Sequence, residues 1–517
     1  MSPALFSALI FLGAGAVGVM LWLVARSLRE YLRMRLPLDQ QRLPSRDTSQ
    51  EPSTKAIKGS MAPPGLPTEG VGLGHNVYGG KETPIYLTEA DRRRHLYLIG
   101  QPGTGKNNLF FNMILQDMRA GRGVGVVDPR GELIEDLLLH VPPARRQDVI
   151  LFDPQDTQRP LGFNVLTVRD EAEKEIVINE VVKILHQLAM RLSPESKGSA
   201  FTRYLDHALL AVMEDRQATL LDVPRLFIDR DFRAAIVAHS HNPVRRQFWE
   251  QEFERAHPGQ LVVDRLRYVM SKLGRFMNNS VMRNIIGQEN SPFDLQEIMD
   301  QQKILLVNLA PRSLGNINSD LLGAVLVAKM QMAAGKRASL PESAGATFYL
   351  YLDEWQNFTT DSMTAVLSGA GQYPLSLNLT HQFTQPLDAP VQKAIFDNVG
   401  TIVSYQVGEQ DATALAPLFA PIFSEYDLLN LERFTAYVRL LVKGVPQPPF
   451  SLRPPLPPAY GDAAGRDAIR MHSRTIYGRL HSQVEEEILQ RLQLGATRLH
   501  HTSLPEPQAA ASSVQVR

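Results

Sequence analysis

The chain has 517 residues, a formal net charge of zero and no cysteine. This length favours more than one domain, and the hydrophobic fraction of 44% is ordinary for a chain that folds around a core. Because the charge is balanced, any contact with nucleic acid has to come from a local basic patch. The lack of cysteine excludes disulfides, thiolate metal sites and cysteine nucleophiles, and it leaves the redox compartment undetermined.

The first 35 residues predict a single membrane anchor. No charged side chain precedes Arg26, and Ala4–Ala25, at about 22 residues, is long enough to cross the hydrocarbon core as a helix. A basic cluster follows directly: Arg26, Arg29, Arg33 and Arg35. A cleaved signal peptide normally has its positive charges before the apolar run, so the anchor is favoured. The positive-inside rule then predicts that most of the chain is cytoplasmic.

Residues 36–69 are polar and rich in Pro and Ser, which is typical of a flexible linker. The nucleotide-binding domain is expected to begin at residue 70. A basic triplet, Arg92, Arg93 and Arg94, lies just before the first predicted core strand. A solvated turn is the simpler interpretation of this triplet, and a nucleic-acid or phosphate contact is the alternative.

The stretch HLYLIGQPGTGKNN, residues 95–108, has the phosphate-loop spacing G-x-x-x-x-G-K between a predicted strand, Leu96–Ile99, and a predicted helix, Leu109–Met118. Its glycines allow backbone N–H groups to surround a phosphate, and Lys106 adds a positive charge near the outer phosphates. A glycine-rich turn without a ligand is disfavoured because strand, loop, lysine and helix are in register. The predicted nucleotide-binding residues are Gly100, Gln101, Pro102, Gly103, Thr104, Gly105, Lys106, Asn107 and Asn108.

Apolar runs that alternate with helical stretches predict a parallel sheet with helices on both faces. Gly123–Val127 and Val149–Phe152 are predicted strands of the first part, residues 70–168. Asp128 follows the first of these strands. Since ligands lie at the carboxyl ends of parallel strands, Asp128 either faces the nucleotide or its metal, or caps the next helix.

Residues 169–290 predict a mostly helical insertion, too long for a loop, that forms a lid or cap on the sheet. Its predicted helices are Glu173–Leu192, Phe201–Glu214, Phe248–Ala256 and Val262–Lys272. The sheet resumes in the second part of the nucleotide-binding domain, residues 291–450. Its predicted strands are Lys303–Leu309, Thr347–Asp353, Leu375–Thr380, Thr401–Val407 and Thr435–Val442.

The strand at residues 347–353 ends in two acids, in the sequence TFYLYLDE. Asp353 is expected to hold magnesium, in part through water, and Glu354 to orient or deprotonate the attacking water. This pattern is weak alone and strong when it is paired with a phosphate loop. Gln382, past the next strand, is a candidate sensor of the terminal phosphate, with a plain strand-end turn as the alternative. The neighbouring His381 is expected to be structural.

Seven segments in order resemble the type IV coupling proteins, and more narrowly the TraG-like conjugative ATPases with a TraM-recognition segment, of the FtsK/HerA superfamily. The resemblance extends from about Leu73 to Val442. The segments are GQPGTGKNN, VGVVDPRGELIEDLLLHVP, VILFDPQD, LGFNVL, RNIIGQENSPFDLQEIMDQQKILLVNL, YLDEWQNF and NVGTIVSYQVGEQDA.

This resemblance implies an α/β fold with a RecA-like phosphate-loop core, an inserted helical domain and a preceding transmembrane helix. It also implies a homo-hexameric ATPase of the bacterial inner membrane that uses ATP and Mg²⁺. The implied partners are relaxase-bound, single-stranded DNA, relaxosome proteins and a type IV secretion channel. The family's nucleotide residues correspond to Gly103, Gly105, Lys106, Asp353, Glu354 and Gln382.

The sequence departs from this family in three places. Asn107 stands where the family has a magnesium-binding hydroxyl; an amide oxygen can replace it, but slow hydrolysis is expected. One membrane helix is predicted where many relatives have two. The family often has an arginine around Gln406, so the arginine finger that completes a neighbour's site is not identified; Arg283 and Arg312 are the candidates.

Residues 451–517 predict a proline-rich and partly disordered tail with a charged helix over Asp467–Leu492. The sequence as a whole predicts a membrane-anchored DNA-translocating ATPase. Three alternatives stay open: a double-stranded DNA pump, a motor that couples protein substrates to a secretion channel, and a nucleotide-binding membrane scaffold with weak turnover.

Overall fold

The computed structural model describes residues 58–497, with gaps at 193–198, 216, 241, 254–272, 275, 339–345, 359–360, 370, 384–386, 388 and 459. The predicted anchor Ala4–Ala25 and the predicted helix Val262–Lys272 lie outside the described residues. Within residues 58–497, apart from those gaps, no helix is both long and apolar enough to cross a membrane.

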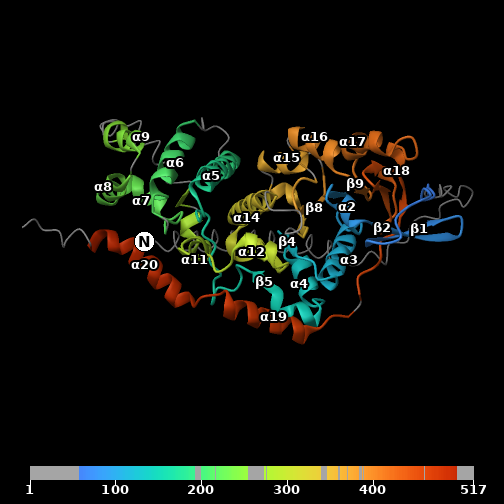
Figure 1. Ribbon diagram of the computed structural model, residues 1–517, viewed down its shortest axis with the longest axis horizontal. Helices are drawn as coiled ribbons and strands as arrows, with labels where there is room; N and C mark the ends of the chain where they lie inside the picture. The colour runs from blue at the N-terminus through green and yellow to red at the C-terminus, as the bar shows by residue number, and fades with distance from the viewer. Residues whose placement is uncertain are drawn as a thin grey trace, which may run out of the picture. The chain divides into compact units, whose positions relative to one another are not determined.

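A nine-stranded sheet forms the centre of the chain, in the order β13-β10-β9-β3-β8-β7-β4-β6-β5 (Figure 1). The strands from β9 to β5 are all parallel, and β10 and β13 pair antiparallel at one edge. Their bounds are β3 Leu96–Ile99, β4 Val124–Asp128, β5 Val149–Phe152, β6 Ile304–Asn308, β7 Phe348–Leu352, β8 Leu375–His381, β9 Thr401–Ser404, β10 Ala436–Arg439 and β13 Phe450–Leu452.

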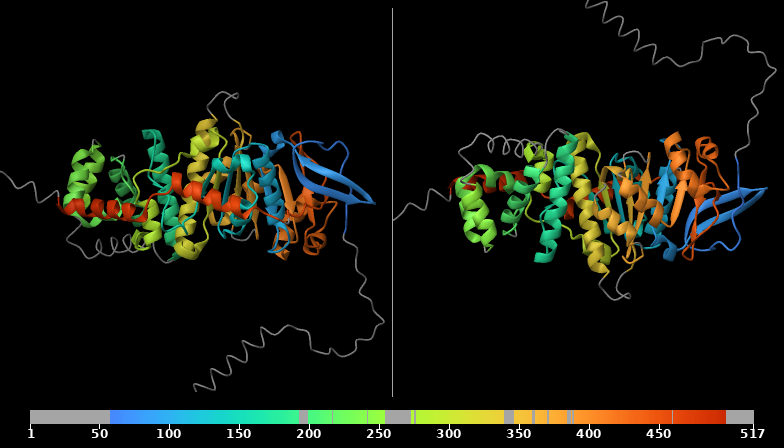
Figure 2. Two further views of the ribbon diagram at one scale, coloured as in Figure 1. Left: turned by 90° about the horizontal axis from the view of Figure 1, so that it is seen from below. Right: turned by 90° about the horizontal axis from the view of Figure 1, so that it is seen from above.

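The parallel sheet and the positions of β3 to β10 are as predicted, whereas the edge strand β13 was not predicted. β9 ends earlier than predicted, at Ser404, and the predicted strand Thr435–Val442 is divided into β10 and β11, Leu441–Val442. β11 leaves the sheet to pair with β12, Val445–Pro446. Two more strands, which the sequence patterns did not predict, form the hairpin of β1, Val71–Tyr78, and β2, Lys81–Leu87. This hairpin extends at the β13 edge of the sheet (Figure 2).

The sheet is buried on both faces because successive strand residues point to opposite sides. On β3, Leu96 and Leu98 belong to one core, and Tyr97 and Ile99 belong to the other. The first core also contains the apolar faces of α3, Lys106–Arg119, and α4, Glu132–Leu138. The second core contains α14, Asn316–Arg337, and other helices of the opposite face. This double burial explains why the strands are continuous apolar runs in the sequence.

The remaining helices and helical turns around the sheet are short. They are α2 Glu89–Arg92, η1 Pro143–Asp148, α12 Leu295–Asp300, α13 Pro311–Leu314, η4 Trp355–Phe358, α15 Asp361–Ser368, α16 Ala389–Asn398, α17 Glu409–Phe419 and α18 Glu425–Leu429.

The predicted helical insertion is present, and α5 packs on α14 of the sheet region. A π-helical segment, η2, replaces the expected α-helix Phe248–Ala256 over its described residues. The elements of the insertion are α5 Glu171–Leu192, α6 Ser199–Val212, α7 Asp222–Ile228, α8 Arg230–His239, α9 Pro243–Gln247, η2 Phe248–Phe253 and α11 Ser280–Ile286.

Two of the three arginines before β3 have partners within the fold, and only Arg94 is exposed. Arg92 is buried, and its guanidinium donates two hydrogen bonds of 2.7 Å to the carboxylate of Asp117 on α3 and one of 2.9 Å to the Tyr351 hydroxyl on β7. Arg93 donates to the carbonyl of Gly371. Asp117 neutralises the charge of Arg92 inside the fold, and the Arg92 guanidinium links α3 to β7. Both the solvated-turn and the nucleic-acid interpretations are therefore wrong for Arg92.

The predicted single helix Asp467–Leu492 is two helices, α19, Ala463–Ile476, and α20, His481–Thr497 (Figure 1). α19 packs on β5, where the Ser473 hydroxyl accepts a hydrogen bond of 2.9 Å from the amide of Leu151. α20 packs on α11 of the insertion, and its Arg491 pairs with Asp222 at 2.9 Å. The break at residues 477–480 allows one segment to contact both regions, which a continuous helix would not do.

Candidate functional site

The phosphate loop joins β3 to α3 as its sequence predicted. Gly103 and Gly105 have φ angles of 75° and 113°, a region that side chains with a Cβ rarely occupy. Gly105 is the N-cap of α3, and Lys106 is the first helical residue. The amides that begin this 14-residue helix therefore follow the glycines directly, and they are available to bind an anion.

Two segments, one after β9 and one before β10, hold the loop in place. The amide of Gln101 donates a hydrogen bond of 2.8 Å to the carbonyl of Gln406, and the amide of Phe434 donates one of 2.8 Å to the carbonyl of Thr104. A Cβ on Gly100 would stand 2.6 Å from the Cβ of Tyr405, so only glycine fits there. The loop is thus fixed by backbone contacts from segments far away in sequence.

Lys106 is buried, and its Nζ donates to the carbonyl of Gly100 and, at 3.2 Å, to that of Gln101. Burial lowers the pKa of Lys106, while the nearby carboxylates of Glu354 and Asp353 act in the opposite direction. The ammonium group therefore lies between the loop and the two acids.

Asp353 follows β7 at the carboxyl edge of the sheet and is buried. Thr380 at the end of β8 donates its hydroxyl to Asp353 Oδ1 at 2.5 Å, and it accepts the amide of Glu354 at 3.0 Å. Burial, with repulsion from Asp128 and Glu354, raises the pKa of Asp353 to about 6, although the Thr380 hydrogen bond opposes the shift. A cation beside Asp353 would relieve this unfavourable burial of negative charge.

Glu354 is held by three donors at once. Arg130 Nη2 lies 2.9 Å from Glu354 Oε1, and Gln382 Nε2 donates to the same oxygen, while Gln356 Nε2 donates to Oε2 at 3.0 Å. Glu354 also has a φ of 45°, which is uncommon for a residue with a side chain. Gln382 thus contacts the second acid directly.

Asp128 caps the turn before α4, since its carboxylate accepts the amides of Arg130 at 2.8 Å and Ile134 at 3.2 Å. Burial raises its pKa, and these amides oppose the shift. Asp128 also raises the pKa of Asp353. The capping interpretation of Asp128 is therefore confirmed, and contact with a nucleotide or its metal stays a prediction.

Other predicted site residues are placed as follows. Asn107 is exposed at the start of α3, and no hydrogen bond of its side chain occurs within the described part of the chain. His381 is buried, with Nδ1 3.0 Å from the Tyr97 hydroxyl, and burial beside Lys106 lowers its pKa to about 3.

The two arginine-finger candidates lie on different helices. Arg283 lies on α11, 3.8 Å from Glu485, and Arg312 is exposed on α13 beside a cavity that Arg130 also lines.

The residues present fit a magnesium nucleotide. The loop offers backbone amides and Lys106 for phosphates, and the acidic end offers a carboxylate with a raised pKa. No group of three or more metal-ligating side chains occurs among the residues that the structure describes. Asp353 would therefore share the ion with phosphate oxygens and water, as is usual for magnesium.

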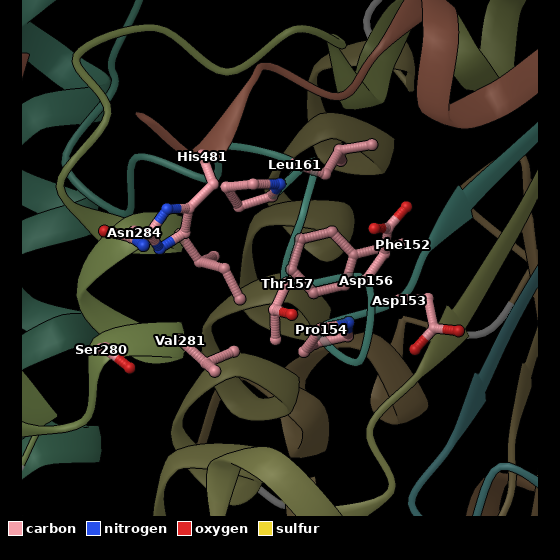
Figure 3. Close-up of a pocket in the computed structure, with 12 residues that line it drawn as sticks. Phe152, Asp153, Pro154, Asp156, Thr157, Leu161, Ser280, Val281, Asn284 and His481 are labelled. Atoms are coloured by element: carbon pink, nitrogen blue, oxygen red, sulfur yellow. The ribbon is translucent and has the colours of Figure 1, made fainter. Parts of the chain in front are cut away.

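A separate small cavity of about 50 Å³ lies between the end of β5 and α11 (Figure 3). Asp153, Asn284 and His481 are among the side chains around it. It is far below the volume of several hundred Å³ that a nucleotide needs. β5 is an edge strand, and β4 and β6 separate it from β7, which carries the two acids. This cavity is therefore not part of the phosphate-loop site.

Three contributors to the site, Arg130, Gln356 and Thr380, were not recognised from the sequence. Arg130 lies two residues after β4, and Thr380 is near the end of β8. Both therefore stand at carboxyl ends of strands adjacent to β7. That strand-end position is the signal that could have found them, but the sequence does not give the strand order.

The parallel sheet, the loop after β3 and the acids after β7 define the class of phosphate-loop α/β proteins. No protein-family model matches the sequence, and a search of curated proteins finds no match. Among solved structures, the chain is similar to the plasmid coupling protein TrwB in complex with the non-hydrolysable GTP analogue GDPNP, with a TM-score of 0.52 and 14% identity. That similarity covers 73% of this chain and 89% of that one.

TrwB in complex with ADP and Mg²⁺ gives a TM-score of 0.52 at 14% identity, over 74% of this chain and 90% of that chain. TrwB in complex with the ATP analogue ADPNP gives 0.52 at 15% identity, over 78% and 98% of the two chains. The chain therefore has the fold of the conjugative coupling protein TrwB. This agrees with the family that the sequence motifs resemble.

Proposed function

We propose that this protein is an ATPase that drives the transfer of conjugative DNA to a type IV secretion channel. The observation that carries the proposal is the placement of Lys106 between the loop carbonyls and the two acids Asp353 and Glu354. The fold of TrwB, a protein whose structures include ADP with Mg²⁺ and an ATP analogue, supports the same reaction.

In the proposed mechanism the loop amides and Lys106 bind the phosphates of ATP. Binding there replaces the loop carbonyls as partners of the Lys106 ammonium group, so its charge is directed to the outer phosphates. A magnesium ion, when bound beside Asp353, would neutralise phosphate charge and orient the terminal phosphate. Thr380 fixes the Asp353 carboxylate for that role.

Glu354 then accepts a proton from the attacking water. In the structure one of its oxygens is occupied by Arg130 and Gln382, so these donors orient the carboxylate and also compete with water for it. Attack of water on the terminal phosphate breaks its bond to the bridging oxygen, which gives ADP and phosphate. Gln382, through its contact with Glu354, can transmit the presence of the terminal phosphate to β8.

The remaining parts of the proposal rest on sequence and fold likeness. The apolar run Ala4–Ala25 supports a membrane anchor, and the resemblance to coupling proteins supports a hexameric ring with DNA in its channel. Contacts to the DNA backbone would make binding fall steeply with salt. Arg283 and Arg312 remain candidates for the arginine that completes a neighbour's site.

A single assay tests this function. We would measure ATP hydrolysis with and without DNA for the natural chain, Lys106→Ala and Asn107→Thr. We expect DNA to stimulate ATP hydrolysis by the natural chain, and we expect Lys106→Ala to lose this activity. A comparison of single- and double-stranded DNA in the same assay distinguishes a conjugative motor from a double-stranded DNA pump.

The exposed Asn107 favours one second candidate function, a nucleotide-binding membrane scaffold with weak turnover. Its amide replaces the hydroxyl that usually follows the loop lysine, and magnesium is then held less well. No stimulated hydrolysis in the natural chain, with recovery in Asn107→Thr, would favour the scaffold over the motor.

A further inference from the structure

An exposed aromatic residue lies directly against the phosphate loop. The Phe434 side chain is 48% exposed, yet its backbone amide donates a hydrogen bond of 2.8 Å to Thr104 within the loop. Its Cδ1 would lie 3.0 Å from a Cβ on Gly105, so the ring packs on the glycine that begins α3. The residue thus contacts the loop and is also accessible to solvent.

The backbone of Phe434 has a φ of 61°. Bulky residues rarely adopt this left-handed conformation, and such strain is found mainly at functional sites, where neighbouring contacts fix it. Here the hydrogen bond to Thr104 and the packing against Gly105 hold the residue. A smaller or more polar residue would satisfy this turn with less strain, so the ring itself requires an explanation.

The order of the sheet says which part of a nucleotide reaches Phe434. β3, which carries the loop, lies between β8 and β9. The acids Asp353 and Glu354 follow β7, beyond β8, so the outer phosphates point to that side. Phe434 precedes β10, beyond β9, on the opposite side. A nucleotide with its terminal phosphate at the acids extends towards β9, and its base arrives beside Phe434.

We infer that Phe434 is the platform on which the nucleobase of the bound nucleotide stacks. This inference rests on the proposed nucleotide site and adds its base-binding part. A phenyl face gives affinity for a purine without selecting between adenine and guanine, because no base edge is read by stacking alone. The site is thus expected to bind ATP and GTP with similar affinity through this residue.

Binding of ATP, GTP and inorganic tripolyphosphate to the full chain, purified in detergent, tests the platform. We expect Phe434→Leu to weaken binding of both nucleotides about tenfold, which is typical for the loss of one stacked base, and to leave tripolyphosphate binding unchanged. Phe434→Tyr should bind like the natural chain. Tyr460→Leu, which removes an aromatic residue that is 92% exposed elsewhere, is the matched control.

The outcomes separate the platform from the site itself. If the natural chain binds ATP no better than tripolyphosphate, or if Phe434→Leu binds ATP normally, the platform is refuted while the nucleotide site stands. Equal losses for ATP and tripolyphosphate in Phe434→Leu mean that the variant distorts the loop, which also refutes the platform. If the natural chain binds none of the three compounds, both the platform and the proposed function fail.

A second measurement reports the ring directly. In Phe434→Trp, stacking of a purine should quench the fluorescence of the new indole, relative to the same titration of the natural chain. Tripolyphosphate should cause no quenching, and the signal should not depend on protein concentration. A change that follows protein concentration and is indifferent to nucleotide would assign the exposed ring to a contact between copies of the chain, and would overturn the inference.

Discussion

The two ends of the phosphate-binding edge are built in different ways. The loop end is one contiguous stretch, residues 100–108, and its chemistry comes mainly from backbone amides and a single lysine. The acidic end combines side chains at the carboxyl ends of three strands. Asp353 and Glu354 follow β7, Thr380 is in β8 with Gln382 just after it, and Arg130 follows β4. One end depends on local conformation, and the other on the packing of the sheet.

Because of this difference, substitutions should affect the two ends differently. We expect the loop end to tolerate change in most side chains, because backbone amides and glycine conformations would bind the phosphates. At the acidic end each carboxylate is fixed by a hydroxyl, amide or guanidinium from another strand, so one substitution alters several contacts together. The predictions below separate the two ends.

The largest effect is expected at the acidic end. Glu354→Gln removes the proton acceptor and keeps the size of the side chain, so kcat for ATP hydrolysis should fall about 1000-fold while ATP binding is retained. Steady-state hydrolysis and direct binding measure the two quantities. Glu432→Gln, at an exposed residue between α18 and β10, is the control. Normal turnover in Glu354→Gln would show that the proton acceptor lies elsewhere.

At the loop end, Lys106→Ala should weaken ATP binding and hydrolysis together, by about 100-fold, because a charge-assisted contact to phosphate is lost. Lys393→Ala, on the exposed surface of α16, should have no effect. Isothermal titration with ATP and the hydrolysis rate are the two readouts. If binding stayed intact and only kcat fell, the loop would not be the phosphate-binding end.

A buried histidine at the amino end of β3, away from the phosphate-binding edge, should make folding sensitive to acid. His95 precedes β3, and its Nδ1 accepts the amide of Leu377 on β8 at 3.1 Å. Burial lowers the pKa of His95 from 6.5 to about 4, so the unfolded chain binds more protons than the folded one between these values. The free energy of unfolding should therefore fall as pH drops through this window, by about 3 kcal/mol in total.

Denaturant unfolding at pH 7 and pH 5 tests this, with His95→Asn as the matched variant. Asparagine tolerates the φ of 66° at this position, and its side-chain oxygen can accept the same amide without titrating. The variant should lose less stability on acidification than the natural chain. An identical loss in both proteins would mean that His95 does not titrate in this range.

The smallest effect is expected from a substitution of Arg130, one of the three donors to Glu354. Arg130 is 46% exposed, and an ion pair of this kind contributes about 0.5–1 kcal/mol. Arg130→Gln should free Glu354 and raise hydrolysis without DNA about two- to fivefold, and lower the stimulation by DNA. Arg119→Gln, exposed at the end of α3, serves as control. A decrease in the rate without DNA would show instead that Arg130 assists the reaction.

The sequence by itself determined the phosphate loop, the run that ends in Asp353 and Glu354, and the parallel sheet with its helical insertion. These features were readable because each is local: a strand buried on both faces is a continuous apolar run, and a phosphate loop needs glycine and lysine at fixed spacing. The same locality explains why the helices were predicted close to their bounds in α5 and α6.

Only the tertiary structure decided the partners of those residues. The order of the strands places Arg130 and Thr380 beside the acids and Phe434 beside the loop, and sequence separation says nothing about that order. The tertiary structure also shows that Arg92 is buried against Asp117 and that the C-terminal helix is divided into α19 and α20. Such contacts depend on which strand lies next to which, because hydrogen bonds and ion pairs require neighbours in space.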